Sequence, residues 1–290
     1  MKDQIIKFLA YNGKISVVCC STTNLVEEAR KLHDLSPLST AAMGRVLTIT
    51  ALIGSEMKNK TDKLTIQIKG NGPIGKIVAV SDNIPNVKAC ITNPHADLPL
   101  NEFNKLDVGG AVGNQGFINV IKDIGLKEPY IGISPLTSGE IAEDLTYYFA
   151  TSEQIPSAVG LGVLMNKNNT VRQAGGFIIQ LMPFTSDEII EKLEKRIAEI
   201  DSVTMMLERG LTPEGILEEI LGDFGLEITD KIPAAFVCDC SKERVSRALS
   251  TLSKKDLDDI INDGESIEVK CQFCNKAYEF SVEELKELRK

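Results

Sequence analysis

Four of the seven cysteines form two tight pairs in the last fifth of the chain. One residue separates Cys238 from Cys240, and two residues separate Cys271 from Cys274. Thiolates are the preferred soft ligands of zinc, and four of them complete a tetrahedral structural site. The pattern therefore predicts a four-cysteine zinc site, although the thirty residues between the pairs are more than most zinc ribbons have. Two metal-free thiol pairs, or unrelated buried cysteines, are the alternatives that the spacing leaves open.

The second pair fits a zinc knuckle. Ser266–Lys270 alternates like a strand, the Cys-x-x-Cys segment makes the turn, and Ala277–Phe280 is the expected return strand. Ser281-x-x-Glu284 is a capping box that should open a last helix. Residues 233–290 contain few large apolar side chains, so a metal should supply much of the folding free energy, on the order of 10–16 kcal/mol as in zinc-finger peptides.

A zinc ion with four thiolates carries a net charge of about −2. Basic side chains near the cysteines in sequence are expected to offset this charge. Four residues meet that description: Lys242, Arg244, Lys270 and Lys276.

Length and composition limit the other possibilities. A chain of 290 residues should form two or three domains. The net charge of −9, the absence of Trp and the aromatic content of 5% argue against a nucleic-acid partner. We find no apolar run of membrane-spanning length and no signal-peptide layout at Met1-Lys2-Asp3-Gln4, so we expect a cytoplasmic protein with reduced cysteines and no membrane partner.

The first 183 residues mix strands and helices without regular βαβ spacing, which predicts an α+β domain. Asn12-Gly13 marks a hairpin, and Ser39–Lys58 is apolar nearly all round, so this helix should be buried. Thr137-x-x-Glu140 is expected to cap a helix. The segment Gly70–Ile77 satisfies a dinucleotide-binding pattern, but the β-branched residues after it predict a strand instead of a helix, so we expect a wide turn and no nucleotide.

Residues 184–232 are expected to form a helical linker, and residues 233–290 a zinc-binding domain. The linker helices are short and therefore marginal alone in water, so they must pack on a neighbour. Cys19 and Cys20 are adjacent in a strand and should point to opposite faces, at least one of them buried. The glycines at 109–116 favour a flexible connection.

No catalytic residue is expected, and the chain is not predicted to be an enzyme. The two histidines, His33 and His95, lie near no nucleophile pattern. Two rival functions stay open on sequence alone: a thiol-disulfide oxidoreductase that uses Cys271-x-x-Cys274, and a zinc-ribbon nucleic-acid binder.

The cysteine segments Cys-Asp-Cys-Ser-Lys-Glu-Arg at 238–244 and Cys-Gln-Phe-Cys at 271–274 resemble those of the 33 kDa chaperonin family. The resemblance extends through nearly the whole chain. Further segments carry it upstream: residues 70–75, 138–148, 152–157 and 174–183. The zinc-ligating, redox-active cysteines of the family correspond to Cys238, Cys240, Cys271 and Cys274, whereas Cys19, Cys20 and Cys90 inherit no role.

The resemblance implies a redox-regulated chaperone that binds unfolding proteins under oxidative stress without ATP. It implies one Zn²⁺ in an inactive reduced form, and activation by disulfide formation and zinc release. The implied partners are unfolded client proteins and, when oxidised, a second copy of the chain. We expect nearest-neighbour disulfides, Cys238–Cys240 and Cys271–Cys274, because each pair is already held together.

Overall fold

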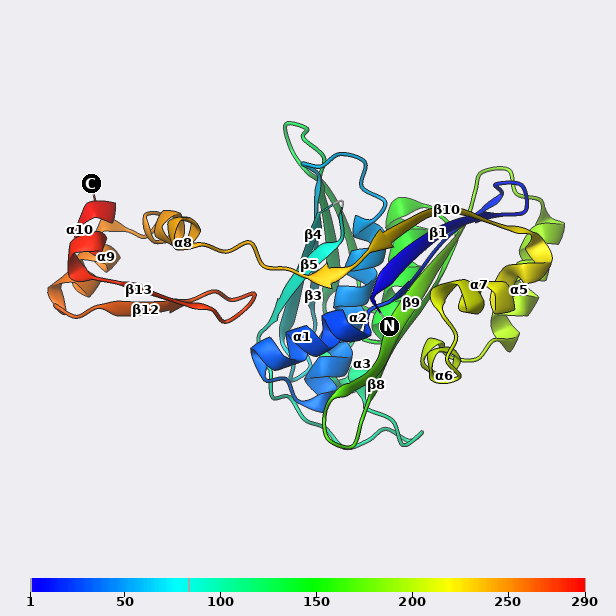
Figure 1. The fold of residues 1–290 in the computed structure, drawn as a ribbon, viewed down its shortest axis with the longest axis horizontal. Helices are drawn as coiled ribbons and strands as arrows, with labels where there is room; N and C mark the ends of the chain where they lie inside the picture. The colour runs from blue at the N-terminus through cyan, green and yellow to red at the C-terminus, as the bar shows by residue number, and fades with distance from the viewer. Residues whose placement is uncertain (1, 83, 290) are drawn as a thin grey trace. The chain divides into compact units, whose positions relative to one another are not determined.

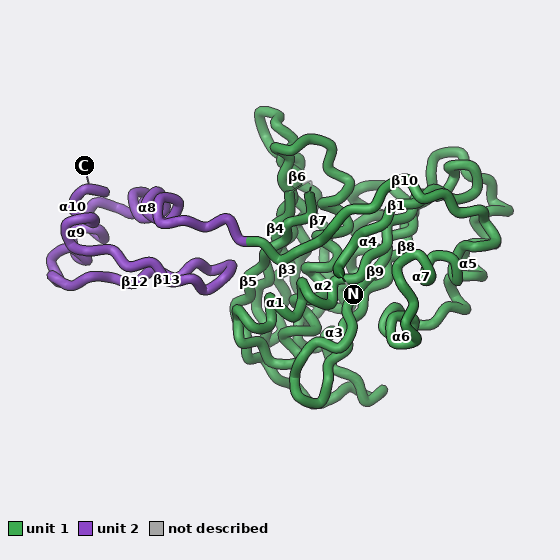
Figure 2. The backbone as a smooth tube through the Cα atoms, in the orientation of Figure 1, with its two compact units in different colours: residues 1–237 green, residues 238–290 purple. Residues whose placement is uncertain are grey.

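The computed structural model describes residues 2–82 and 84–289, and the chain divides into two compact units, Met1–Val237 and Cys238–Lys290 (Figure 2). The first unit contains a five-stranded and a six-stranded sheet, and the second a two-stranded sheet. The protein is therefore a mixed α/β protein with several sheets.

The first sheet is antiparallel and has the strand order β10-β1-β2-β9-β8. Its strands are β1 (Gln4–Ala10), β2 (Ile15–Ser21), β8 (Ser157–Met165), β9 (Val171–Leu181) and β10 (Leu226–Pro233). The β1–β2 hairpin has the predicted turn, because Asn12 and Gly13 both have positive φ and the Lys14 amide donates to the Tyr11 carbonyl at 3.2 Å.

The second sheet has the order β11-β5-β4-β3-β6-β7, and its pairs are antiparallel except β11 with β5. Its strands are β3 (Lys63–Lys69), β4 (Lys76–Asp82), β5 (Asn86–Ile91), β6 (Phe117–Asp123), β7 (Tyr130–Pro135) and β11 (Ala235–Phe236). Helix α2 (Pro37–Gly54) packs against both sheets, and α1 (Thr23–His33) lies beside it (Figure 1).

Helix α2 is buried almost all round, as its composition predicts. It ends at Gly54 and does not reach Lys58. Contrary to our expectation, it is long and apolar enough to cross a membrane by length and composition alone, but 89% of that window is buried within the protein. Its position between two sheets is that of a core helix.

The glycine-rich segment after β3 is the expected wide turn, since Lys69 pairs with Lys76 across it. The glycines that follow later are not a flexible connection, because they include the short helix α3 (Val108–Val112), whose carbonyls accept from the turn. A Cβ at Gly72 would lie 2.3 Å from the Ala111 carbonyl oxygen, so this close approach requires glycine.

The capping box expected at Thr137 and Glu140 is wrong. Helix α4 (Ile141–Tyr148) begins one residue after Glu140, and no side chain caps it. The carboxylate of Asp144 instead accepts from the backbone and hydroxyl of Thr137, at 2.6 and 2.8 Å. A π-helical turn, η1 (Phe149–Glu153), continues α4.

Three short helices follow β9: α5 (Asp187–Glu199), α6 (Val203–Glu208) and α7 (Pro213–Leu221), and then a 3₁₀ turn, η2 (Gly222–Phe224). Their apolar side chains pack on one face of the first sheet and form with it a group of buried residues that we call the linker cluster. Its members are Ile6, Phe8, Ala10, Ile15, Val17, Cys19, Phe177, Ile179, Ile189, Leu193, Val203, Met206, Leu207, Ile216, Leu217, Ile220, Leu221 and Phe224.

The helices of this segment were predicted, whereas strands β10 and β11 were not. Strand β10 adds to the edge of the first sheet beside β1. Residues 184–232 thus belong to the same compact unit as the residues before them. The division of the chain at residues 183 and 232 stays a prediction.

The second unit contains α8 (Lys242–Leu249), α9 (Lys254–Asn262), β12 (Ile267–Lys270), β13 (Ala277–Phe280) and α10 (Val282–Leu288). The capping box at Ser281 and Glu284 is confirmed, since both of its hydrogen bonds are present. The buried residues of this unit, which we call the tail cluster, are Leu249, Leu257, Tyr278, Phe280 and Leu285.

Candidate metal centre

The two cysteine pairs are positioned by local turns. Cys271 follows β12, and its amide donates to the Lys276 carbonyl at 3.0 Å, closing the turn between β12 and β13. Asn275 lies in this turn with a φ of 56°, a conformation that Asn tolerates better than most residues. Cys240 precedes Ser241, the residue whose side chain caps α8.

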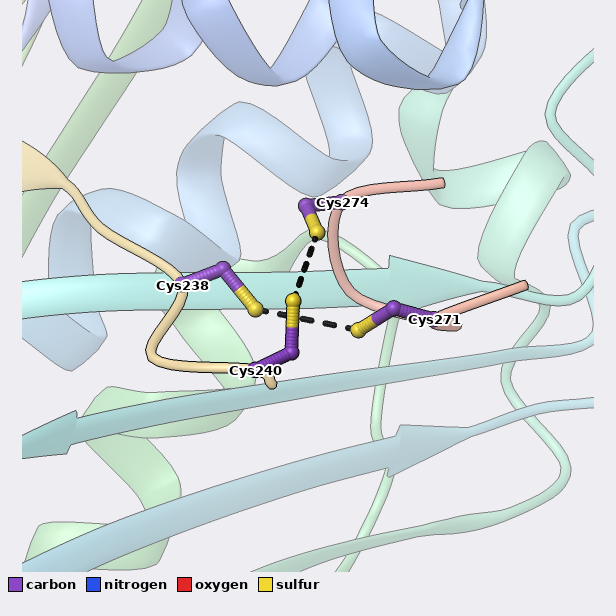
Figure 3. A group of neighbouring side chains, drawn as sticks. All are labelled: Cys238, Cys240, Cys271 and Cys274. Atoms are coloured by element: carbon purple, nitrogen blue, oxygen red, sulfur yellow. Dashed lines mark hydrogen bonds between the residues drawn. The ribbon is translucent and has the colours of Figure 1, made fainter. Parts of the chain in front are cut away.

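The structure brings the four predicted cysteines together in the second unit (Figure 3). The Cys238 and Cys271 sulfurs are 3.7 Å apart, and the Cys240 and Cys274 sulfurs are 3.4 Å apart. All four lie within 4.8 Å of one another. A disulfide would be about 2.0 Å long, whereas a tetrahedron with metal–sulfur bonds of about 2.3 Å has edges of about 3.8 Å.

The donor set fits zinc. The four sulfurs form a closed set of soft ligands, at separations close to those of a tetrahedron. A closed set leaves no position for a substrate or a reacting water molecule, which is typical of a structural site and not of a catalytic one. The arrangement can therefore hold a metal ion; the roles of Cys238, Cys240, Cys271 and Cys274 as zinc ligands and redox-active residues stay predictions.

Hydrogen-bond donors surround the sulfurs. The Tyr278 hydroxyl donates to the Cys240 sulfur at 3.1 Å. Burial raises the pKa of Cys238 and of Cys274, although the amides of Cys240 and Lys276 oppose this by donating to the two sulfurs. Burial alone would also raise the pKa of Cys240, but the Tyr278 hydroxyl and the neighbouring cysteines favour its thiolate and lower the pKa to about 7.

Each basic residue expected to offset the charge of the site contacts a partner other than a cysteine. Their partners are Glu284 for Lys242, Asp239 for Arg244, Glu268 for Lys270, and the ring of Tyr278 for Lys276. Three of the four thus neutralise carboxylates. Hydrogen bonds from N–H and O–H donors, more than ion pairs, would therefore stabilise the negative charge of four thiolates.

The other cysteines, Cys19, Cys20 and Cys90, belong to the first unit. Cys19 and Cys20 are both buried and point to opposite faces of β2, as expected. Cys19 belongs to the linker cluster, and Cys20 packs in the core around α2. Burial raises the pKa of both thiols, so neither is primed for reaction.

Sequence reasoning missed Tyr278. Its signal was available in the alternation of β13, in which Tyr278 and Phe280 are buried and their neighbours are exposed. That pattern places the Tyr278 ring in the tail cluster but does not indicate that its hydroxyl reaches a cysteine.

Comparison with known proteins gives consistent matches over the whole chain. A family model described as Hsp33 protein matches residues 3–281. The 33 kDa chaperonin of Agathobacter rectalis is 62% identical over 289 residues, covering 100% of both chains. That of Clostridioides difficile is 50% identical, covering 100% of this chain and 99% of its own.

A solved structure matches as well. The crystal structure of the 33 kDa chaperonin (heat shock protein 33 homolog) from Thermotoga maritima superposes with a TM-score of 0.91 at 40% identity. The alignment covers 100% of this chain and 98% of the other.

Proposed function

The chain belongs to the Hsp33 family of chaperones, and from that membership and its four-cysteine cluster we propose a redox-regulated, ATP-independent holdase. It would bind unfolding proteins under oxidative stress in the cytoplasm, where thiols are kept reduced until an oxidant arrives. The observation that carries the proposal is the convergence of four cysteine sulfurs within 4.8 Å in a unit with a small apolar core.

In the reduced form, Cys238, Cys240, Cys271 and Cys274 would hold one Zn²⁺ between them. When bound, the ion would cross-link the segment before α8 to the turn between β12 and β13. The tail cluster has five buried residues, which is little for a domain of this size, so metal binding would supply most of its stability.

Oxidation would convert each pair to a disulfide. Two thiolates give up two electrons to one molecule of hydrogen peroxide, an S–S bond forms, the O–O bond breaks, and two protons from solvent complete two molecules of water. We propose the pairs Cys238–Cys240 and Cys271–Cys274. Disulfide sulfurs are poor zinc ligands, so the site is lost and the second unit unfolds.

Residues 184–232 would be the client-binding linker. Their helices are too short to be stable in water without the sheet on which they pack, and their release would expose both faces of the linker cluster. Met205 is 56% exposed and its neighbour Met206 is fully buried, so release of the linker would expose a second flexible methionine side chain to clients. We further propose that the oxidised protein forms a homodimer.

Two observations count against the rival functions. The Cys271-x-x-Cys274 segment lies between β12 and β13, and no helix N-terminus follows it to lower a thiol pKa as oxidoreductases require. The net charge of −9 is unsuited to a nucleic-acid surface. The proposal is therefore a chaperone and not an enzyme.

The test combines metal analysis with an aggregation assay. The reduced protein should contain one zinc per chain and should not suppress the aggregation of a thermally unfolding enzyme, whereas two equivalents of peroxide should release the zinc and switch suppression on. Cys271→Ser should lose the zinc, and Cys90→Ser, outside the cluster, should behave as the parent. Equal suppression by the reduced parent, or catalytic reduction of insulin, would contradict the proposal.

Peptide mapping of the oxidised protein tests the pairing separately. We expect each disulfide to link cysteines of one pair. A predominance of Cys240–Cys271 would refute the proposed pairs without affecting the proposed switch.

A further inference from the structure

One side chain of the tail cluster reaches out of the core to the cysteines. Tyr278 lies in β13 opposite Val269 of β12, and its residue is only 8% exposed. Its hydroxyl donates to the Cys240 sulfur at 3.1 Å. The Lys276 ammonium lies 5.4 Å from the centre of the Tyr278 ring, a cation–π contact that helps to hold the ring in place.

Packing explains the ring of Tyr278 but not its hydroxyl. Phe280, two residues further along the same face of β13, fills the core with an unsubstituted ring. A phenylalanine at 278 would bury the same apolar surface, and only a contact at the far end of the ring calls for tyrosine. That contact is with Cys240, one of the four proposed metal ligands.

A hydrogen bond to a thiolate changes its chemistry in two ways. The donor shares the negative charge of the sulfur, which stabilises the charged set of ligands when a metal is bound. It also occupies a sulfur lone pair and lowers the electron density there. When sulfur attacks peroxide, an S–O bond forms, the O–O bond breaks, and hydroxide leaves and takes a proton; a sulfur of lower electron density is a weaker nucleophile and attacks more slowly.

We propose that Tyr278 is a positioning residue whose hydroxyl sets the rate at which this site is oxidised and loses its metal. The inference rests on the proposed zinc switch. It adds that the hydrogen bond to Cys240 sets the oxidant concentration at which the switch responds, because it protects the reduced site at low oxidant levels. A second thiolate then attacks the sulfur of the resulting sulfenic acid, which forms the S–S bond, breaks the S–O bond and releases hydroxide.

The test uses Tyr278→Phe in the full chain, with its fold checked by circular dichroism. Zinc release by hydrogen peroxide, followed with a chromophoric chelator, should be about tenfold faster than in the parent, the order expected for losing a hydrogen bond to a charged group. In the cobalt-substituted protein, the sulfur-to-metal charge-transfer band should move to lower energy, because the sulfur orbital is no longer stabilised by the donor.

Leu257→Ala is the packing control, because it opens the same cluster without touching a donor to sulfur. It should lower stability and leave the charge-transfer band in place. An unchanged release rate and band in Tyr278→Phe, or an equal band shift in Leu257→Ala, would overturn the role of the hydroxyl. A parent that bound no zinc, or kept it in peroxide, would instead overturn the proposed switch and this inference with it.

Discussion

The linker cluster and the tail cluster are built in opposite ways. The linker cluster gathers eighteen buried residues from a sheet, three helices and a 3₁₀ turn, whereas the tail cluster has five among residues 238–289, the described part of the second unit. At about 25 cal/mol per Å² of buried apolar surface, the first can hold its helices by packing alone. The second needs another source of free energy, and its four cysteines are placed to provide one through a metal.

Ion pairs do little to alter this contrast. The linker helices carry several, such as Arg196 with Asp223 at 2.8 Å and Lys231 with Glu214 at 2.7 Å. Their basic side chains are substantially exposed, and exposed pairs contribute about 0–1 kcal/mol each. Burial against the sheet is thus the main attachment of the linker, and a chemical switch can act on the tail without direct chemistry on the linker.

The largest effect should come from removing the metal under reducing conditions. A strong chelator should unfold the second unit, because its apolar core is too small to compensate for the loss of binding free energy on the order of 10–16 kcal/mol. Hydrogen exchange should show β12 and β13 unprotected while β1 and β2 keep their protection. Equal loss of exchange protection in both units, or no loss in the second, would contradict the contrast between a packed linker and a metal-dependent tail.

The next effect is a difference between two adjacent thiols. If oxidation frees the linker from the sheet, Cys19 becomes accessible while Cys20, on the core side of β2, stays covered. Alkylation of the peroxide-treated protein should therefore modify Cys19 more than tenfold faster than Cys20, and neither should react in the reduced protein. Mass spectrometry of the tryptic peptide gives both rates, and equal rates would mean that the whole unit opens.

A core substitution in the linker should mimic part of this release. Leu217→Ala removes a fully buried side chain of α7 and should cost about 2–5 kcal/mol of linker packing. Some suppression of client aggregation should then appear in reducing buffer with zinc still bound. Glu218→Ala, exposed on the same helix, is the matched control and should stay inactive.

Features with a local cause were predictable. The Asn12-Gly13 turn, the apolar helix α2 and the capping box at Ser281 all follow from patterns local in the sequence. Strand β10 was missed because most of its side chains are exposed and its pairing with β1 bridges more than two hundred residues of sequence. Such an edge strand has no alternation for a sequence pattern to detect.

The same distinction applies to the site. The convergence of the four cysteines was predictable from their two close pairs together with the family resemblance, although the spacing by itself left alternatives open. Their electrostatic surroundings were not: Arg244 was expected to offset their charge and pairs with Asp239, while the donor that does reach Cys240 comes from Tyr278, thirty-eight residues away in sequence. Nearness in sequence is a weak guide to which charges meet, because turns and strand pairing decide the direction of each side chain.

The smallest effect concerns a polar contact of the first unit and tests whether packing dominates there. The Glu27 carboxylate accepts from Arg30 at 2.9 Å and from the Val171 amide at 2.9 Å, which ties α1 to β9. The hydrogen bond from Arg30 is the main reason that the pKa of Glu27 is lowered from its usual 4.5, with burial acting against it. A carboxyl whose pKa is lower in the folded state stabilises the fold above its unfolded pKa and loses that contribution as the pH falls through the folded value.

Glu27→Gln should therefore destabilise the first unit by about 1 kcal/mol at neutral pH, and the difference from the parent should shrink as the pH falls through the lowered pKa of Glu27 and the parent carboxyl is protonated as well. Thermal unfolding of parent and variant across this pH range measures it, with Glu28→Gln, exposed on the same helix, as the control. A cost of several kcal/mol would place polar contacts on a level with packing in the first unit, and a pH-independent cost would assign the loss to geometry and not to the charge of Glu27.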